Sequence, residues 1–311
     1  MWGIIVNLFQ ENMLQSVATI VAPSARPMPQ GLENQAAQAV KALGVDRLEI
    51  QTLDNGHAFD VLFSGENANL RQQAQTVLRA LGSYDVFVQA NDDFRRKKLL
   101  LADMDATMIE GETLDDLAAH LGIHDKIAPI TAAAMRGEID FGEALRQRIL
   151  LLKGLPVAVV MEAVSKVRYS AGAKTAIRTM RSFGARCVLI SGGFDMFTSH
   201  VAAELGFHKN IANRLSIENE HLTGMVIPPI VDKTVKKNTL EEEARTLGIT
   251  PLQTMAVGDG ANDIPMLQAA GAGVGYFGKP AVQAATPYQI RHSDLTALLY
   301  MQGYRKADFK G

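Results

Sequence analysis

An apolar run that ends at two acidic residues constrains the fold of this chain most strongly. The run Leu99–Ala102 leads into Asp103 and Asp105, which are separated by one methionine. Such a run is typical of a strand buried on both faces of a parallel sheet, and open α/β sheets bind ligands at the carboxyl ends of their strands. Two adjacent carboxylates repel each other, so the pattern predicts a compensating cation, with one carboxylate left to act as a nucleophile. An acidic turn after a strand is the alternative, which this pair alone does not exclude.

The segments that follow predict an α/β architecture with an insertion. About sixty mostly helical residues come next, too many for a simple crossover, and we expect helices at 113–121, 124–136, 141–152 and 157–167. Strands and helices then alternate, which predicts a mostly parallel sheet with helices on both faces. We expect strands at 186–190 and 254–257, a hairpin of 211–217 and 221–227, and helices at 173–183, 194–205, 236–247 and 263–270.

Residues 13–92 have a different pattern, which predicts a small α+β domain. We expect strands at 15–22, 47–53, 57–64 and 84–89 and helices at 31–43 and 68–81, with a hairpin turn at Asp54–Gly56. The order βαββαβ is that of ferredoxin-like folds. The segment holds no cluster of catalytic residue types. We therefore expect it to serve packing or dimerisation, with small-molecule sensing as the alternative.

A second apolar run ends at a hydroxyl and two glycines. Ser191 is followed by Gly192 and Gly193, and then by an expected helix. Glycines allow backbone N–H groups to approach an anion, and the amino end of a helix favours negative charge, so the segment indicates phosphate binding. A simple turn between strand and helix explains this segment equally well when it is taken alone.

A third strand end carries further acidic groups. The segment Gly-Asp-Gly-x-Asn-Asp places Asp259, Asn262 and Asp263 after the strand expected at 254–257. Asp259 is expected to reach a metal held by the first acidic pair, Asp263 to ligate or support it, and Asn262 to offer hydrogen bonds. A turn in which Asp263 caps a helix is the structural alternative. One lysine of the adjacent pair Lys236 and Lys237 could neutralise these carboxylates and a phosphoryl group.

The combination of Asp-x-Asp-x-Thr, Ser-Gly, Lys and Gly-Asp-Gly-x-Asn-Asp, in this order, resembles the haloacid dehalogenase-like superfamily. Within it, residues 99–285 are similar to phosphoserine phosphatases, including segments 110–113, 134–141 and 148–155. The resemblance implies a Rossmann-like parallel core (99–109 and 170–311), an inserted helical cap (110–169) and an ACT-like regulatory domain (13–92). The chain departs at Ala106, where the family often has serine, and we expect little effect. Spacing to Thr239 favours Lys236 over Lys237 as the family's lysine.

The resemblance also implies a role for each residue of the cluster. Asp103 is the expected nucleophile, which forms an aspartyl-phosphate, and Asp105 is the expected acid and base. Mg²⁺ is expected on the carboxylates of Asp103 and Asp259 and on the backbone carbonyl of Asp105, with Asp263 in support. The residues expected to hold the phosphoryl group are Ser191, Gly192 and Lys236, with Asn262 close by.

The cap is expected to recognise the amino acid part of the substrate through three residues. Glu112 would pair with an ammonium, and Arg148 would bind a carboxylate bidentately. Phe141 lies seven residues before Arg148, so both fall on one helix face. The structural alternatives are a core position for Phe141 and an ion pair with a cap glutamate for Arg148.

The expected activity is therefore Mg²⁺-dependent hydrolysis of O-phospho-L-serine to L-serine and phosphate, the last step of serine biosynthesis. One alternative is the same chemistry on another small phosphomonoester, or phosphoryl transfer to another hydroxy amino acid. The other alternative is a ligand-sensing regulatory protein built on residues 13–92.

Charge and composition exclude several other partners. A net charge of −2 gives no drive toward nucleic acid or acidic membranes, and the basic run at 95–98 is short and lacks aromatic residues. The apolar first residues have no basic flank and no long apolar core, so neither a signal peptide nor a membrane span is expected, and Met13 is an alternative start to Met1. Cys187 is the only cysteine, which excludes a disulfide framework and fits the cytoplasm. A homodimer through the N-terminal domain is expected.

Overall fold

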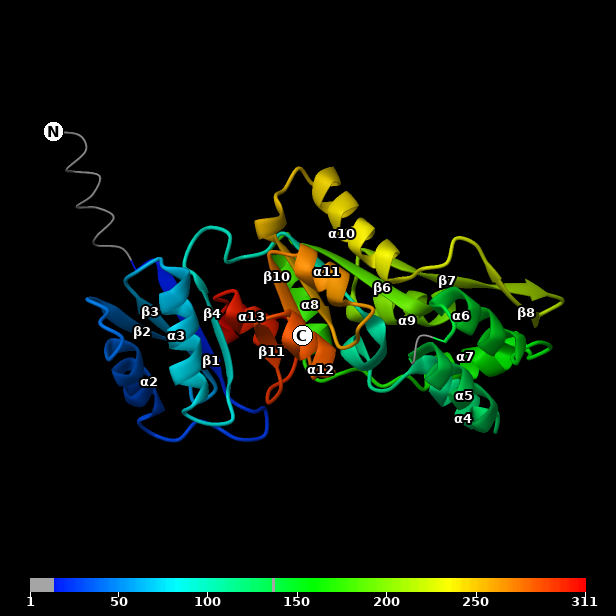
Figure 1. Cartoon of the computed structure of the whole chain (residues 1–311), viewed down its shortest axis with the longest axis horizontal. Coiled ribbons are helices and arrows are strands. Elements are labelled where there is room, and N and C mark those ends of the chain that lie inside the picture. The colour runs from blue at the N-terminus through cyan, green and yellow to red at the C-terminus, as the bar shows by residue number, and fades with distance from the viewer. Residues whose placement is uncertain (1–13, 136–137) are drawn as a thin grey trace.

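The computed structural model describes residues 14–135 and 138–311, so the expectation about Met13 lies outside the described residues. The molecule is elongated, with an N-terminal sheet at one end, a larger sheet with helices in the middle, and a group of helices beside a β-hairpin at the other end (Figure 1). Across the part of the chain that the structure describes, no helix is long and apolar enough to cross a membrane.

The N-terminal sheet is antiparallel and has the strand order β2-β3-β1-β4, as the predicted ferredoxin-like fold requires. Leu32, Ala36 and Val40 form the buried stripe of helix α2, because residues four apart lie on one helix face. The elements are β1 (Ser16–Val21), α2 (Leu32–Lys41), β2 (Leu48–Asp54), β3 (Ala58–Phe63), α3 (Ala68–Arg79) and β4 (Asp85–Ala90).

The central sheet has seven strands in the order β11-β10-β9-β5-β6-β7-β8. Its neighbours pair in parallel from β11 to β7, and β8 is antiparallel to β7, so the expected parallel sheet and hairpin are confirmed. Strand β6 extends beyond the predicted Ile190, although its register with β7 shifts between Ile190 and Phe194. The strands are β5 (Leu99–Ala102), β6 (Arg186–Phe194), β7 (Lys209–Glu218), β8 (His221–Ile227), β9 (Thr254–Gly258), β10 (Ala272–Tyr276) and β11 (Tyr288–Ile290).

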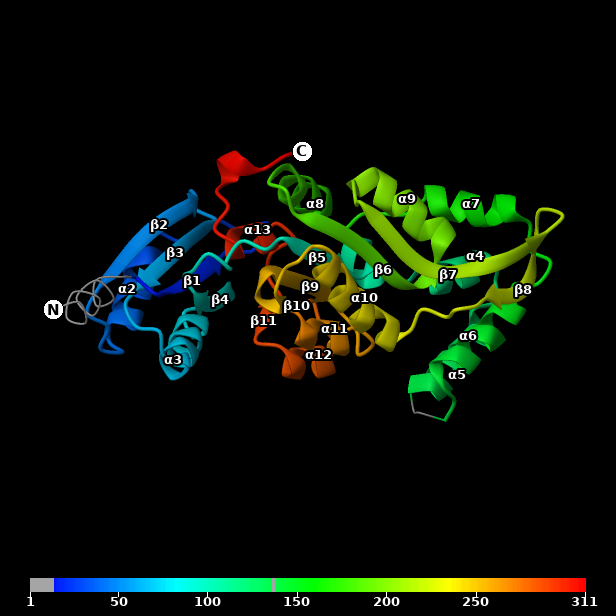
Figure 2. The same ribbon diagram turned by 90° about the horizontal axis from the view of Figure 1, so that it is seen from above.

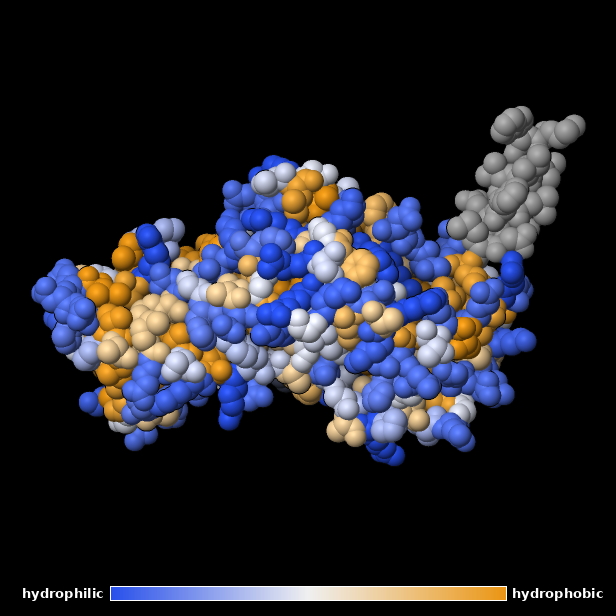
Figure 3. All heavy atoms as spheres, turned by 180° about the vertical axis from the view of Figure 1, so that it is seen from behind, coloured by the Kyte–Doolittle hydropathy of each residue, from blue (hydrophilic) through white to orange (hydrophobic). Residues whose placement is uncertain are grey.

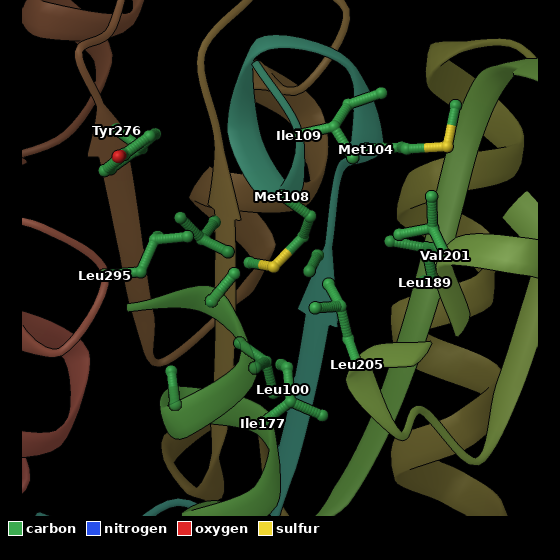
Figure 4. Packing of buried hydrophobic residues seen from close by; sticks show 14 of the residues in the cluster. Leu100, Met104, Met108, Ile109, Ile177, Leu189, Val201, Leu205, Tyr276 and Leu295 are labelled. Carbon is green, nitrogen blue, oxygen red and sulfur yellow. The ribbon is translucent and has the colours of Figure 1, made fainter. Parts of the chain in front are cut away.

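Both faces of the central sheet are covered by helices, because successive side chains of a buried strand point to opposite faces. Leu100 of β5 packs with helices α8, α9 and α13, where its neighbours include Ile177 and Leu205 (Figure 4). Leu99 and Leu101 pack on the opposite face with α10, α11 and α12. These helices are α8 (Ala173–Ser182), α9 (Asp195–Leu205), α10 (Lys233–Thr246), α11 (Ile264–Ala269), α12 (Pro280–Ala285) and α13 (Ala297–Met301).

The inserted helices lie between β5 and α8 in the chain, and all four expected ones are present. Asp140 caps α6 by accepting a hydrogen bond from the Glu143 N–H at 2.9 Å. The β7–β8 hairpin extends from the central sheet to these helices, and a bridge joins Pro156 to His221 (Figure 2). The cap helices are α4 (Thr113–His120), α5 (His124–Met135), α6 (Phe141–Leu150) and α7 (Val157–Ser165).

The N-terminal sheet packs directly on the core. Val21 and Phe87 of that sheet belong to the same buried apolar cluster as Tyr300 and Met301 of α13. Strand β4 also contacts β11, which is the edge strand of the central sheet. The face of the N-terminal sheet that its own helices leave free is therefore covered by the core.

Exposed apolar side chains gather at the end of the molecule that the cap and the hairpin form. The exposed side chains there include Leu150 of α6 and Met225 of β8. In the view from behind, this end carries the largest apolar patch, whereas the surface over the central sheet is mainly hydrophilic (Figure 3).

Candidate active site

The first acidic pair lies at the carboxyl end of the central strand β5, between the ends of β6 and β9. The Asp103 N–H donates to the carbonyl of Val257 at 3.0 Å, which fixes this strand end against β9. A tight turn over Met104–Met108 follows, in which Ala106 has a φ of 50°. Asp103 directly follows the strand, whereas Asp105 lies within the turn just before this left-handed residue, so the two carboxylates face different surroundings.

The two carboxylates differ in their partners. Asp103 is 4% exposed and accepts a hydrogen bond from Lys236 Nζ at 2.6 Å. Asp105 accepts from the Thr113 N–H at 2.8 Å and from the Ser191 hydroxyl at 2.9 Å. A buried lysine thus neutralises the first carboxylate, whereas neutral donors orient the second.

Lys236 is the lysine that reaches the cluster. It is 1% exposed, and its Nζ also donates to Asp263 Oδ1 at 2.7 Å. Although burial opposes the charged form, Asp103 and Asp263 raise the pKa of Lys236, which keeps it charged. Lys237 points away and pairs with Glu241 at 2.7 Å on the surface.

Three buried carboxylates at this edge form a group suited to a cation. Oxygen atoms of Asp103, Asp259 and Asp263 lie within 4.8 Å of one another. Burial and the nearby Asp263 raise the pKa of Asp103 well above its ordinary value, and burial raises that of Asp259, so a bound cation would favour the ionised form of both carboxylates. Oxygen-only donors suit a hard divalent cation. The Asp105 carboxylate accepts a hydrogen bond from Ser191. The metal contact expected of Asp105 is therefore the one through its backbone carbonyl.

The end of β6 provides a fixed polar loop. Ser191 is fully buried, and its hydroxyl accepts from the Gly193 N–H at 2.8 Å. The Asn213 side chain donates to the carbonyl of Gly192 and accepts from the Val231 N–H, both at 2.8 Å. A Cβ on Gly193 would lie 3.1 Å from Asp105 Oδ2, so a glycine is needed for this close approach.

A cavity of about 400 Å³ lies between this edge of the sheet and the cap. The core supplies the acidic strand ends, and the cap supplies apolar side chains together with Glu112 and Arg148. Lys236 and Asp263 do not line it and lie behind Asp103. The other predicted site residues all line the cavity: Asp103, Asp105, Glu112, Phe141, Arg148, Ser191, Gly192, Asp259 and Asn262.

The cap residues Phe141 and Arg148 both face this cavity. Phe141 is 37% exposed, so it is not a core residue, and a Cβ on Gly192 would lie 3.2 Å from its ring. Arg148 donates to the carbonyl of Ala144 at 3.2 Å, and burial lowers its pKa. Among the described residues, no carboxylate lies within ion-pair distance of Arg148, which leaves its guanidinium available to a ligand.

Lys279 is a cavity residue that the sequence reasoning missed. Its Nζ lies 3.0 Å from Asp259 Oδ2 and 3.5 Å from Glu112 Oε1. Burial and the charge of Asp105 raise the pKa of Glu112 to about 7, although Lys279 opposes this shift. The available signal was a glycine and a proline on either side of Lys279, just after the apolar segment that forms β10.

These features define a hydrolase of known class. The family model for haloacid dehalogenase-like hydrolases matches residues 100–268, which cover the acidic strand ends, the cap and Lys236. The chain belongs to this family.

Sequence relatives from several organisms are named phosphoserine phosphatases. The chain is 37% identical over 290 residues to the phosphoserine phosphatase SerB2 of Mycobacterium tuberculosis, an alignment that covers 92% of this chain and 71% of that protein. It is 44% identical over 203 residues to a phosphoserine phosphatase of Lactococcus lactis, covering 65% of this chain and 94% of the relative. The crystal structure of a probable phosphoserine phosphatase from Vibrio cholerae matches 96% of this chain and 89% of its own, with 26% identity and a TM-score of 0.73.

Proposed function

We propose that this chain is a phosphoserine phosphatase that hydrolyses O-phospho-L-serine to L-serine and phosphate. The observation that supports this function best is that Asp103, Asp105, Glu112 and Arg148 line one cavity. The carboxylates of Asp103 and Asp105 suit attack on a phosphomonoester. Glu112 and Arg148 complement the ammonium and the carboxylate of an amino acid. The names of the relatives support the same substrate.

In the proposed first step, a carboxylate oxygen of Asp103 attacks phosphorus. The bond from phosphorus to the serine oxygen breaks, and that oxygen takes a proton from Asp105. In the second step Asp105 removes a proton from water, and the water oxygen attacks the phosphorus of the aspartyl-phosphate. The bond from phosphorus to the Asp103 oxygen breaks, which releases phosphate and restores the Asp103 carboxylate. The hydrogen bonds from Thr113 and Ser191 orient Asp105 for both proton transfers.

The buried charges support the choice of Asp103 as the nucleophile. Lys236 donates to Asp103 at 2.6 Å, so it holds the carboxylate in place and offsets the charge of an incoming phosphate. Gly192 and Ser191 belong to the fixed loop at the end of β6 and are proposed to hold the phosphoryl oxygens. Asn262 faces the same part of the cavity and is proposed to lie near them.

We propose that the cation is Mg²⁺, held by the carboxylates of Asp103 and Asp259 and the backbone carbonyl of Asp105. Asp263 would support it from behind. When bound, Mg²⁺ would lower the repulsion between a carboxylate and a phosphate dianion. The grouping of three buried carboxylates supports this assignment.

In the cap, Glu112 is proposed to bind the substrate ammonium and Arg148 its carboxylate. Phe141 would close the side of the cavity above Gly192. The proposed division is a regulatory domain at 13–92, a core of 99–109 and 170–311, and a cap at 110–169. We also propose a cytoplasmic enzyme that dimerises through the N-terminal domain, whose β2 is an outer strand of its sheet.

The decisive test replaces the nucleophile. Asp103→Asn keeps the size of the side chain but weakens its nucleophilicity, so kcat on phosphoserine should fall by at least about a thousandfold. Circular dichroism should show an unchanged fold. Lys237→Met, which alters a surface lysine paired with Glu241, should retain full activity.

Hydrolysis by Asp103→Asn at the wild-type rate would refute the mechanism. Activity of the wild type should also be lost on dialysis against a chelator and restored by Mg²⁺. A panel of other phosphomonoesters, assayed with and without hydroxyl acceptors, would identify a different substrate or a phosphotransferase.

A further inference from the structure

Lys279 lies at the boundary between the core and the helical cap. Its backbone N–H donates to the carbonyl of Asp259 at 2.9 Å, and Pro280 begins helix α12 directly after it. The backbone of Lys279 is therefore fixed beside the end of β9. Its side chain is 55% exposed and lines the cavity, so it can change partners without disturbing the fold.

The side chain of Lys279 connects two carboxylates with different proposed roles. Its Nζ lies 3.0 Å from Asp259 Oδ2 on the core and 3.5 Å from Glu112 Oε1, which precedes the first cap helix α4. Lys236, by contrast, forms ion pairs with Asp103 and Asp263. Within residues 14–135 and 138–311, Lys279 supplies the only side-chain cation within 4.0 Å of Glu112.

The contact between Lys279 and Glu112 is of a kind that a ligand can replace. The distance between Nζ and Oε1 is long, and both side chains are about half exposed to solvent, so this ion pair is weak. A substrate ammonium offers the same charge and the same N–H donors as the lysine. Two ammonium groups cannot both stay close to one carboxylate without repelling each other.

We propose that Lys279 is a positioning residue that competes with the substrate ammonium for Glu112. This inference rests on the phosphoserine phosphatase activity proposed above. Without substrate, Lys279 serves as the counter-ion of Glu112, and it moves away into solvent when the amine of phosphoserine binds. Lys279 thereby limits how strongly the site prefers phosphomonoesters that carry an amine.

The test compares two substrates that differ only at the amine. The ratio of kcat/KM for O-phospho-L-serine to kcat/KM for 3-phospho-L-glycerate, which has a hydroxyl in place of the amine, is measured at saturating Mg²⁺. The pH is about 9, well above the pKa of Glu112, so that Glu112 is ionised with or without Lys279. Lys279→Met removes the competitor, so the ratio should rise about threefold, the scale of a weak exposed ion pair. Lys279→Arg keeps the charge and Lys237→Met alters a remote surface lysine, so both should leave the ratio near the wild-type value.

A double-mutant cycle identifies the partner through which Lys279 acts. In a Glu112→Gln background, Lys279→Met should leave the ratio unchanged, because no carboxylate remains to compete for. A ratio that is unchanged or lowered by Lys279→Met alone, or that rises equally in both backgrounds, would overturn the proposal. Absence of phosphoserine hydrolysis by the wild type would instead refute the proposed function itself.

Discussion

At the scale of single residues, environment gives identical side chains different chemistry. Asp103 and Asp105 are separated by one residue, yet the first contacts a buried ammonium and the second a hydroxyl and a backbone N–H. Lys236 favours the ionised form of Asp103 and opposes the raised pKa that burial gives it, whereas neutral donors orient Asp105 without adding charge. The separation of roles follows from their backbone positions, because Asp103 directly follows β5 and Asp105 lies within the turn over Met104–Met108.

The carboxyl group of Glu112 should make substrate binding dependent on pH. Burial and Asp105 raise its pKa to about 7, so it is neutral below that pH and negatively charged above it. Only the charged form pairs with an ammonium. We therefore expect kcat/KM for phosphoserine to fall more steeply between pH 8 and pH 6, about one unit on either side of that pKa, than for 3-phosphoglycerate.

The matched control for this pH effect is Glu112→Gln, which cannot titrate. It should lower kcat/KM for phosphoserine at pH 8 and give parallel pH profiles for the two substrates. Since titration of the phosphate affects both substrates alike, parallel profiles in the wild type would contradict the role of Glu112.

At the scale of secondary structure, helix α10 positions Lys236. The helix begins after Asp232, whose carboxylate accepts from the N–H groups of Thr234 at 2.8 Å and Val235 at 2.9 Å. Those donors would otherwise lack partners within the helix. The Asp232 side chain, as the N-cap of α10, thus fixes the first turn of the helix, from which Lys236 reaches Asp103.

Removing the Asp232 N-cap should lower both the stability and the activity of the protein. Asp232→Ala should lower the free energy of unfolding by about 1 kcal/mol in urea denaturation, and should lower kcat because Lys236 is less firmly held. Asp232→Asn keeps a capping oxygen and should lose much less of both. Equal stability of the alanine and asparagine variants would show that the Asp232 N-cap does not stabilise α10.

At the scale of the whole molecule, the N-terminal sheet is tied to the core by a buried carboxylate. Asp85 at the start of β4 is 2% exposed and accepts hydrogen bonds from the backbone N–H groups of Arg291, His292 and Ser293 and from the Ser293 hydroxyl. The apolar contacts of Val21 with α13 lie in the same interface. The two parts should therefore unfold together, and a chain cut near Asp92 should expose the apolar surface of α13.

Asp85→Ala tests this coupling. It leaves several buried donors without a partner, so the free energy of unfolding should fall by roughly 3 kcal/mol. Asp46→Ala, a change at an exposed acid in the same sheet domain, should have almost no effect. Denaturation followed by fluorescence and by loss of activity should give coincident transitions in the wild type. If Asp85→Ala unfolds at the wild-type urea concentration, the contact does not hold the domains together.

Much of the architecture follows from local sequence patterns. Apolar runs and turn residues predicted the N-terminal order βαββαβ, the four cap helices and the central strands, because strand and helix periods are set by the residues nearby. One predicted boundary differs at α10, which begins at Lys233 rather than at Lys236, because Asp232 caps the helix through a local contact that the prediction did not use. Strands β10 and β11 and helices α12 and α13 fell outside the predicted elements.

The sequence by itself determined that acidic groups end the neighbouring strands β5 and β9, since parallel strands bring their carboxyl ends to one edge. Only the tertiary structure shows the physical reason why particular side chains meet there. Spacing within the family's motif favoured Lys236, and the packing of α10 explains the choice, because adjacent lysines on a helix point about 100° apart and only Lys236 contacts Asp103. The same holds for Lys279, which reaches Glu112 from 167 residues away in the chain. Such contacts depend on how separate elements pack, and no local pattern encodes them.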